Sequence, residues 1–279
     1  MNRAKSLIND FVEEWLRGNL DELVRFDFAQ LRGDNKYGVC SGGSFDCDNT
    51  KLSKAIYLLV FEDVWNDLTF FSLENRMYRG DTINSFNTTF GKTVTTGGFA
   101  GLNRFKPDES LQQRVLNFHS LYHTIGNFMV LPNACAVGYT LNTFRGSYYQ
   151  WRDYIDKFIG ALHLLLTDPQ SANNEPFHQL IAANIKDFEP YFHQEGFELL
   201  MDKLLLNDCI DQEGKPKQLF DVVYHWDKRL TRDMYLKHIN QYLDFNESFI
   251  EKRGARMVGI LASKLGYKQI MENNRSLPY

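Results

Sequence analysis

Side chains suited to acid–base chemistry gather in one stretch of the chain, residues 114–146, RVLNFHSLYHTIGNFMVLPNACAVGYTLNTFRG. Histidine exchanges protons near neutral pH, and arginine binds phosphate or carboxylate oxygens through a planar fork of N–H groups. Proton transfer by a positioned side chain, together with an anion clamp, is typical of enzymes that act on phosphate groups. We therefore expect the catalytic residues to be Arg114, His119, His123 and Arg145.

Small and amide residues in the same stretch are candidates for ligand binding. Glycine lets the backbone approach a ligand closely, and an asparagine amide offers both a donor and an acceptor. Arg145 stands at the start of an expected helix, where backbone N–H groups favour an anion; its alternative role is an ion pair with Asp153 or Asp156. The expected ligand-binding residues are Thr124, Gly126, Asn127, Asn142 and Gly146.

Arg114 and His119 have the spacing of the arginine and histidine pair in a class of helical ribonucleases. In that class the arginine holds the phosphodiester and the histidine moves a proton while a 2′-hydroxyl attacks. Val115 stands where those enzymes carry a polar residue, and this spacing also arises by chance in helical chains. The alternative is an exposed arginine and a histidine held by an ordinary hydrogen bond.

His119 and His123 are one helical turn apart, so both imidazoles can face one point. Zinc ligands on helices share this spacing, but the intervening Ser-Leu-Tyr lacks the glutamate of the H-E-x-x-H motif, and the sequence marks no third ligand. The sequence contains no cofactor fingerprint either. We expect two histidines on the wall of a polar pocket, with no metal and no cofactor.

Three further motifs resemble parts of known enzyme signatures. Asp46 and Asp48 match the D-x-D-x-T pattern of aspartyl-phosphate phosphatases, but no buried strand precedes them, so we expect an acidic cluster at a helix start. The tripeptide Arg79-Gly80-Asp81 is expected to form a turn, because the other elements of ADP-ribosyltransferases, which carry a similar arginine, are not evident. Residues 123–133 resemble a segment of HNH endonucleases without their metal-binding element.

The overall composition is typical of a soluble globular protein. Of the 279 residues, 43% are hydrophobic and 24% are charged. A formal net charge of -4 disfavours a surface built throughout for the nucleic-acid backbone, although a local basic groove is compatible with that average.

Cysteine usage and the N-terminal segment bear on the compartment. The four cysteines, at 40, 47, 135 and 209, are too far apart for a C-x-x-C site and too few for a disulfide framework, so we expect free thiols. The N-terminal segment lacks the apolar core of a signal peptide, and the longest apolar runs are far shorter than the ~18 residues of a membrane span. We expect a cytoplasmic protein that does not enter the membrane.

Hydrophobic periodicity indicates the elements that carry these residues. The N-terminal part is expected to hold helices at 3–17, at 20–31 and from a cap at Asn49 or Thr50 to about Trp65, then β-like segments at 68–72 and 77–86. Any small sheet is expected within 70–105. The later helices are expected at 108–125, 147–166, 176–185, 187–207, 218–226, 231–253 and 255–272.

The expected fold class is mainly α with a small β element (α+β), in a single compact domain over residues 1–279. The alternative is a boundary near residue 106, with N-terminal helices and the β element before it and a helical part, 107–279, after it.

Three blocks of the chain resemble a family of bacterial proteins of unknown function: TIGNFMVLPN (124–133), LNTFRG (141–146) and YYQWRDYIDKFIGAL (148–162). The resemblance implies a single bacterial domain and carries no activity with it. His119 and His123 depart from the pattern. Residues that match it are Thr124, Gly126, Asn142, Arg145 and Gly146, and it extends weakly to 26–28, Asp46, Asp48, Asn49, Leu52, Trp65 and 246–250.

The sequence thus leaves two classes of function open. One is an enzyme, a nuclease-like effector, whose polar pocket acts on or binds a phosphate-bearing ligand such as RNA or a nucleotide. The other is a non-catalytic binding or interaction protein. The sequence predicts no membrane partner and leaves the oligomeric state open.

Overall fold

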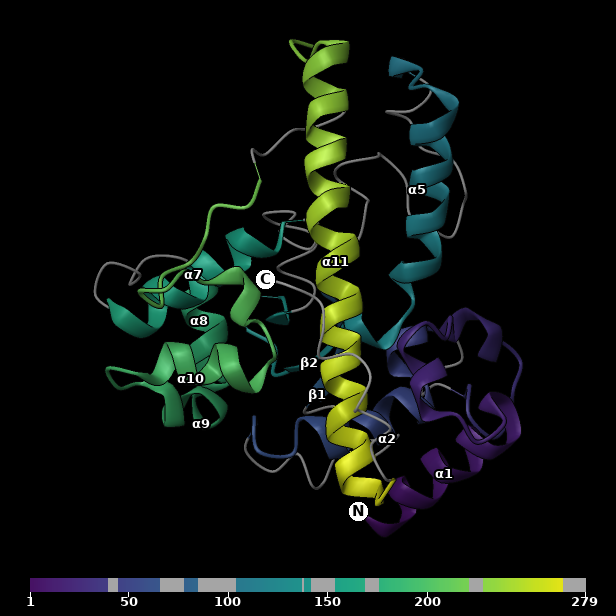
Figure 1. Cartoon of the computed structure of the whole chain (residues 1–279). Helices are drawn as coiled ribbons and strands as arrows, with labels where there is room; N and C mark the ends of the chain where they lie inside the picture. Colours follow the sequence, from purple (N-terminus) through teal and green to yellow (C-terminus); the bar gives the residue numbers. More distant parts are fainter. Residues whose placement is uncertain are drawn as a thin grey trace.

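A single long helix, α11 (Arg232–Leu265), runs the length of the molecule, and the other elements are arranged around it (Figure 1). The computed structural model describes residues 1–39, 45–65, 78–84, 104–136, 138–141, 154–168, 176–220 and 228–267. Within these ranges the chain is mainly helical and carries one two-stranded sheet. The expected fold class, mainly α with a small β element, is confirmed.

The prediction of two helices, 231–253 and 255–272, is wrong, because α11 continues through Gly254. A glycine inside a helix costs about 1 kcal/mol relative to alanine. A Cβ built at Gly254 would lie 3.6 Å from the Cα of Gly126, an ordinary contact, whereas a Cβ at Gly126 would lie 2.9 Å from Gly254 N. The close approach therefore requires the glycine at 126, and α11 ends only at Gly266, which has a left-handed φ of 81°.

Helix α5 (Glu109–Tyr122) lies beside the first half of α11 and runs parallel to it (Figure 1). The Asp108 side chain caps it by accepting a hydrogen bond from Leu111 N at 2.9 Å. The helix ends before the expected residue 125, because the chain turns at His123 into the 3₁₀ helix η6 (Ile125–Asn127). His123 is therefore placed at the C-terminal end of α5.

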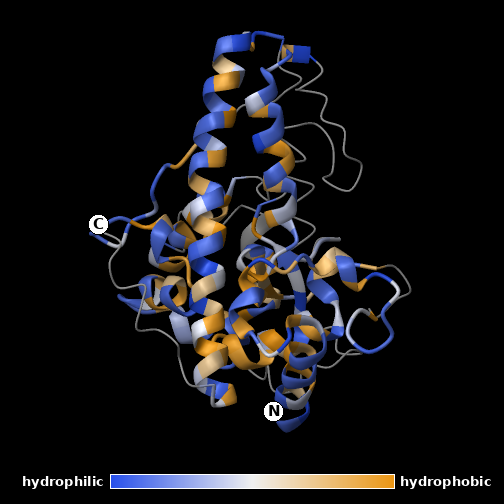
Figure 2. Cartoon of the chain, turned by 45° about the vertical axis from the view of Figure 1, so that its right-hand side comes forward, coloured by the Kyte–Doolittle hydropathy of each residue, from blue (hydrophilic) through white to orange (hydrophobic). Residues whose placement is uncertain are grey.

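The N-terminal helices α1 (Asn2–Leu16) and α2 (Lys51–Val60) pack together, and α2 packs against the second half of α11. Thr50 caps α2, as expected, by accepting from Ser53 N at 3.0 Å. The helix ends at Val60 and not at Trp65, whose indole donates to Val130 O at 2.8 Å. Figure 2 shows hydrophobic residues concentrated around these helices and hydrophilic residues toward the start of α11.

The helix expected at 20–31 is replaced by two short 3₁₀ helices, η1 (Leu20–Val24) and η2 (Phe28–Leu31). The Asp27 side chain caps η2 by accepting from Ala29 N at 2.8 Å, and this bond requires an extended backbone at Asp27. Such local bonds compete with a continuous helix, which is why the segment divides at this residue.

The sheet pairs β1 (Tyr78–Thr82) with β2 (Phe128–Pro132) in antiparallel register. The prediction that any sheet would lie within 70–105 is wrong for the second strand. All five residues of β2 are buried, so its apolar run shows no alternation that would distinguish it from a buried helix. The tripeptide Arg79-Gly80-Asp81 lies in β1 and not in a turn, and the expected segment 68–72 lies outside the described residues.

A group of shorter helices covers the side of α11 opposite to α5 (Figure 1). The helix expected at 187–207 is interrupted, because Pro190 stands in a 3₁₀ turn and the chain bends before Gly196. Residues 147–153 and 221–226, where helix was also expected, lie outside the described part of the chain. The elements of this group are α7 (Ile155–Thr167), α8 (Pro176–Ala183), α9 (Ile185–Phe188), η8 (Glu189–Tyr191), α10 (Gly196–Lys203) and η9 (Asn207–Cys209).

Candidate functional site

His123 lies where the end of α5 meets the start of η2. Its carbonyl oxygen accepts a hydrogen bond from Phe28 N at 3.0 Å, and its ring nitrogen Nδ1 faces Asp27 Oδ1 at 3.7 Å. The side chain is only 10% exposed. Burial lowers the pKa of His123, and His119 and Arg32 oppose its charged form further, whereas Asp27 acts in the other direction. The imidazole is therefore neutral at pH 7 and able to accept a proton.

His119 stands one turn earlier on α5 and is half-buried. The centroids of its ring and of the His123 ring are 6.4 Å apart, with the ring planes nearly perpendicular at 78°. The two imidazoles therefore lie next to each other, and the polar pocket expected around them stays a prediction. Two groups at this separation can serve two atoms of one substrate, one as proton acceptor and one as proton donor.

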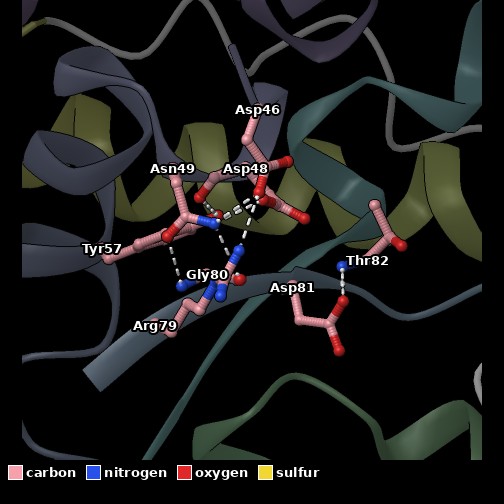
Figure 3. Close-up of polar contacts among 8 residues, drawn as sticks. All are labelled: Asp46, Asp48, Asn49, Tyr57, Arg79, Gly80, Asp81 and Thr82. Carbon is pink, nitrogen blue, oxygen red and sulfur yellow. Dashed lines mark hydrogen bonds and ion pairs between the residues drawn. The ribbon is translucent and has the colours of Figure 1, made fainter. Parts of the chain in front are cut away.

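A second polar group joins the 3₁₀ helix η3 (Cys47–Asn49) to strand β1 (Figure 3). The Asn49 amide is its centre: Nδ2 donates to Asp48 Oδ1 at 2.7 Å, to Asp46 Oδ2 at 3.1 Å and to Gly80 O at 3.1 Å. The amide oxygen accepts from Gly80 N at 3.0 Å. Gly80 must be glycine, since a Cβ there would lie 1.8 Å from Asp48 O.

Asp48 is buried among other carboxyl groups. Burial raises its pKa well above the ordinary value, and the charge of Asp46, a hydrogen bond with Asp46 and the charge of Asp81 add to the effect. Burial and the neighbouring carboxylates therefore favour the protonated form of Asp48. Arg79, half-exposed, approaches Asp46 at 3.4 Å, while Figure 3 shows Asp81 on the opposite side of β1, with its Oδ1 accepting from Thr82 N at 2.8 Å.

The histidines and the carboxyl pair adjoin each other at one place, which we call the junction site: Asp27, Arg32, Asp46, Asp48, Arg79, His119 and His123. Cys47 belongs to η3, which is in contact with η2. Burial raises the pKa of the Cys47 thiol far above neutrality, and Asp48, Asp27 and Asp46 raise it further, so the thiol is not a nucleophile at pH 7. Asp46 also acts on the charge of His123.

Two exposed arginines border the junction site. Arg32 follows η2, and its guanidinium stacks over the Phe45 ring at 4.7 Å. Arg79 occupies β1 and is paired with Asp46. The site thus combines buried proton-carrying groups with cations at its surface. Among the described residues, no group of three or more histidine, cysteine, aspartate or glutamate side chains is arranged to hold a metal ion.

Arg114, expected to be catalytic, is held elsewhere. Its guanidinium donates to both carboxylate oxygens of Glu247, at 2.7–3.1 Å, and to Asp244 at 2.6 Å. These bonds raise its pKa and connect α5 to α11. The structure therefore does not bring Arg114 to the histidines as a free anion clamp.

Three expected ligand-binding residues form internal contacts. Thr124 Oγ1 donates to Leu121 O at 2.9 Å, and Gly126 packs on the backbone of α11. Asn127 clamps Asn84: its Oδ1 accepts from Asn84 N, and its Nδ2 donates to Asn84 O, both at 3.0 Å. The remaining expected residues lie outside the described part of the chain: the ligand-binding Asn142 and Gly146 and the catalytic Arg145.

Sequence reasoning missed Asp27 and Arg32 and assigned Asp46 and Asp48 to an ordinary helix start. Asp27 is 96 positions before His123 in the chain, and no periodic pattern connects the two. The run of acidic residues before Thr50 was the one visible signal, because a helix cap needs a single carboxylate or hydroxyl and this segment has two carboxylates in addition to the threonine.

Comparison with known proteins places the chain in a family. A family model described as a family of unknown function (DUF6994) matches residues 100–257, more than half of the chain. The protein belongs to this family, and the expectation of a family without an assigned function is confirmed. No curated protein and no solved structure matches the chain.

Proposed function

We propose that the protein is an enzyme that acts on a phosphate-bearing ligand such as RNA or a nucleotide, with His119 and His123 as its acid–base pair. The observation that carries the proposal is the pairing of two imidazoles, 6.4 Å apart, beside a carboxylate. His123 is neutral because burial lowers its pKa, so it is the base of the pair. His119, which is more exposed, is the proton donor.

The reaction that fits this pair is cleavage of RNA by its own 2′-hydroxyl. His123 takes the proton of the hydroxyl, the 2′-oxygen forms a bond to phosphorus, and the bond from phosphorus to the 5′-oxygen breaks. His119 gives its proton to the departing oxygen. In the described part of the chain, Arg32 and Arg79 are the cations that we expect to bind the phosphate oxygens. Arg145 stays a predicted third phosphate-binding residue.

The proposal is tested with a short RNA and with the same RNA in which the nucleotide that would supply the attacking 2′-hydroxyl carries 2′-deoxyribose. We expect the RNA alone to be cut, and His123→Ala and His119→Ala each to lower kcat by about 10²–10⁴-fold. His193→Ala is the matched control, because His193 is exposed and lies after η8, away from the pair. RNA that stays intact, or variants as active as the control, would contradict the proposal.

The second candidate is a non-catalytic binding or interaction protein. What favours it is that Arg114, Thr124, Gly126 and Asn127 all stabilise internal contacts, so fewer of the predicted residues are available to a ligand. Calorimetric titration with RNA and with nucleotides distinguishes the two: binding without turnover, unchanged in His123→Ala, supports the second candidate.

We also propose, from the sequence, that the protein is bacterial and cytoplasmic. Free thiols support this proposal, since Cys47, Cys135 and Cys209 form no disulfide and reducing compartments keep cysteines in this state. Separately, none of the helices in the described residues has the length and apolar character needed to cross a membrane. Fractionation of the producing cells tests the compartment, and the protein is expected in the cytosolic fraction.

A further inference from the structure

The start of η2 holds His123 at two points. Phe28 N donates to the His123 carbonyl oxygen at 3.0 Å, which fixes the backbone at the end of α5. The neighbouring Asp27 presents its Oδ1 to His123 Nδ1 at 3.7 Å. The same oxygen accepts from Ala29 N at 2.8 Å, so the carboxylate is fixed by its capping role and cannot rotate freely. Phe28 is further anchored by its edge-to-face contact with Phe128, with centroids 5.1 Å apart.

We propose that Asp27 is the positioning residue of His123: it orients the imidazole, keeps the ring proton on Nδ1, and leaves Nε2 as the proton acceptor. A neutral imidazole has one N–H, and an ionised carboxylate can only accept a hydrogen bond, so the proton is favoured on the nitrogen that faces Asp27. Nδ1 is buried and has no hydrogen-bond partner among the described residues, so the exposed tenth of the side chain belongs to other ring atoms.

The separation of 3.7 Å is longer than a hydrogen bond, so the two groups interact by charge in this state. When His123 takes up a proton it becomes cationic, and the attraction to Asp27 increases. Catalytic hydrogen bonds are often long before a substrate binds and shorten during the reaction. Asp27 thus stabilises the form of His123 that follows proton abstraction.

Other charged groups also face His123, and they define the controls. Asp46, from η3, acts in the same direction as Asp27 but more weakly, whereas His119 on α5 and Arg32 after η2 oppose the charged imidazole. Removing the Asp27 charge must therefore lower the pKa of His123. Removing the Asp46 charge must lower it less.

Asp27→Asn is the decisive variant, because asparagine caps a helix as well as aspartate does and its Oδ1 can still accept from Ala29 N. The fold is thus kept while the charge is removed. Asp34→Asn is the matched control: Asp34 also caps a turn, accepting from Lys36 N at 2.8 Å, and it is not among the main groups that act on His123. Both variants lose one negative charge.

Nitrogen NMR of the histidine rings gives the first readout, and it needs no substrate. In the unaltered protein we expect neutral His123 with its proton on Nδ1. Asp27→Asn should lower the His123 pKa by more than Asp46→Asn does and weaken the preference for the Nδ1 proton, because a neutral amide oxygen accepts less strongly than a carboxylate, while Asp34→Asn should change neither. A His123 pKa and tautomer that stay the same in Asp27→Asn overturn the inference.

The role of Asp27 in catalysis rests on the proposed function, and RNA cleavage is the second measurement. Activity requires neutral His123, so the rate rises with pH through the His123 pKa. Asp27→Asn should lower kcat by on the order of 10²-fold and move this rise to lower pH. A loss of rate without a shift of the pH–rate profile contradicts a positioning role. If the unaltered protein does not cleave RNA, only the proposed function is contradicted, because the NMR measurement tests the role of Asp27 independently.

Discussion

The surroundings of Asp48 oppose its ionised form. It is buried, Asp46 and Asp81 carry the same charge, and a hydrogen bond with Asp46 favours the protonated state, so its pKa is raised. The folded chain holds this proton more tightly than the unfolded chain does. Asp48 therefore favours folding at low pH, and this contribution is lost as the pH rises above the ordinary aspartate pKa of about 4 toward the raised value.

From this sign we predict the effect of Asp48→Asn. The asparagine amide can donate to Asp46 as the protonated carboxyl does, and its oxygen can still accept from Asn49 Nδ2. The variant should be at least as stable as the unaltered protein at neutral pH, with an advantage that grows as the pH rises above about 4, the ordinary aspartate pKa. Thermal unfolding across this range checks it. A variant midpoint below that of the unaltered protein at the higher pH values would mean that Asp48 is ionised in the fold.

At the residue scale, the sequence predicted the pairing of His119 with His123, because a four-residue spacing on a helix places both side chains on one face. It did not predict Asp27, whose contact with His123 depends on how η2 packs on the end of α5. Arg114 was misassigned for a similar reason: its partners Glu247 and Asp244 come from a helix more than a hundred residues later.

At the element scale, two glycines at the contact between η6 and α11 give a matched pair of predictions. A Cβ at Gly126 would lie 1.9 Å from Ile250 O, inside backbone that cannot move aside. A Cβ at Gly254 would meet Val24 at 3.4 Å and Gly126 at 3.6 Å, which are ordinary contacts. Gly126→Ala should therefore destabilise the fold by about 3 kcal/mol or more, whereas Gly254→Ala should stay within about 1 kcal/mol of the unaltered protein.

Denaturant unfolding monitored by circular dichroism measures both variants. Equal losses of stability would show that the two glycines have the same role and that the close approach is not at Gly126. The same contact explains why the sequence misplaced a helix boundary at Gly254. Propensity treats glycine as a helix breaker, but one glycine costs only about 1 kcal/mol in a helix, and the packing of η6 on α11 keeps the helix continuous through Gly254.

Strand β2 is the other element that local patterns could not identify. Its residues are buried on both faces, so the period of two that marks a half-exposed strand is missing. Its partner β1 ends at Thr82, which is 46 positions before the first residue of β2, Phe128. Helices with one exposed face, such as α1 and α5, were predicted to within a few residues because their amphipathic period is local.

At the scale of the whole molecule, Arg253 links three parts of the chain. It is fully buried on α11 and donates to Leu204 O at 3.0–3.1 Å, to Gly126 O at 2.8 Å and to Phe128 O at 2.6 Å. Burial lowers its pKa to about 9, so it keeps its charge at neutral pH. Its removal leaves three carbonyl groups without their donor.

We predict that Arg253→Leu lowers the free energy of unfolding by about 3 kcal/mol or more, since each unsatisfied buried group costs roughly 1–3 kcal/mol. Arg256→Leu is the control: Arg256 pairs with Asp208 at 2.7 Å with both side chains 36% exposed, and such pairs contribute about 1 kcal/mol or less. Chemical denaturation measures both. A loss in Arg253→Leu no larger than in the control would contradict the linking role.

The proposal of a single domain leads to a prediction about fragments. The family model begins at residue 100, close to the alternative boundary near 106, and this range would suit a C-terminal domain. Yet α11 packs on α2 and η1, the His123 carbonyl accepts from Phe28 N, and β2 needs β1 as its partner. A fragment of residues 107–279 would leave these apolar faces and the β2 edge uncovered.

We therefore expect the isolated 107–279 fragment to unfold without a cooperative transition, and the whole chain to unfold in one. Calorimetry of the two proteins, with mixing of the 1–106 and 107–279 fragments as a control, tests this. Recovery of a cooperative transition on mixing would agree with one shared core. A fragment that unfolds cooperatively by itself, at a midpoint close to that of the whole chain, would instead establish the boundary near 106, because its α11 would then be stable without the N-terminal helices.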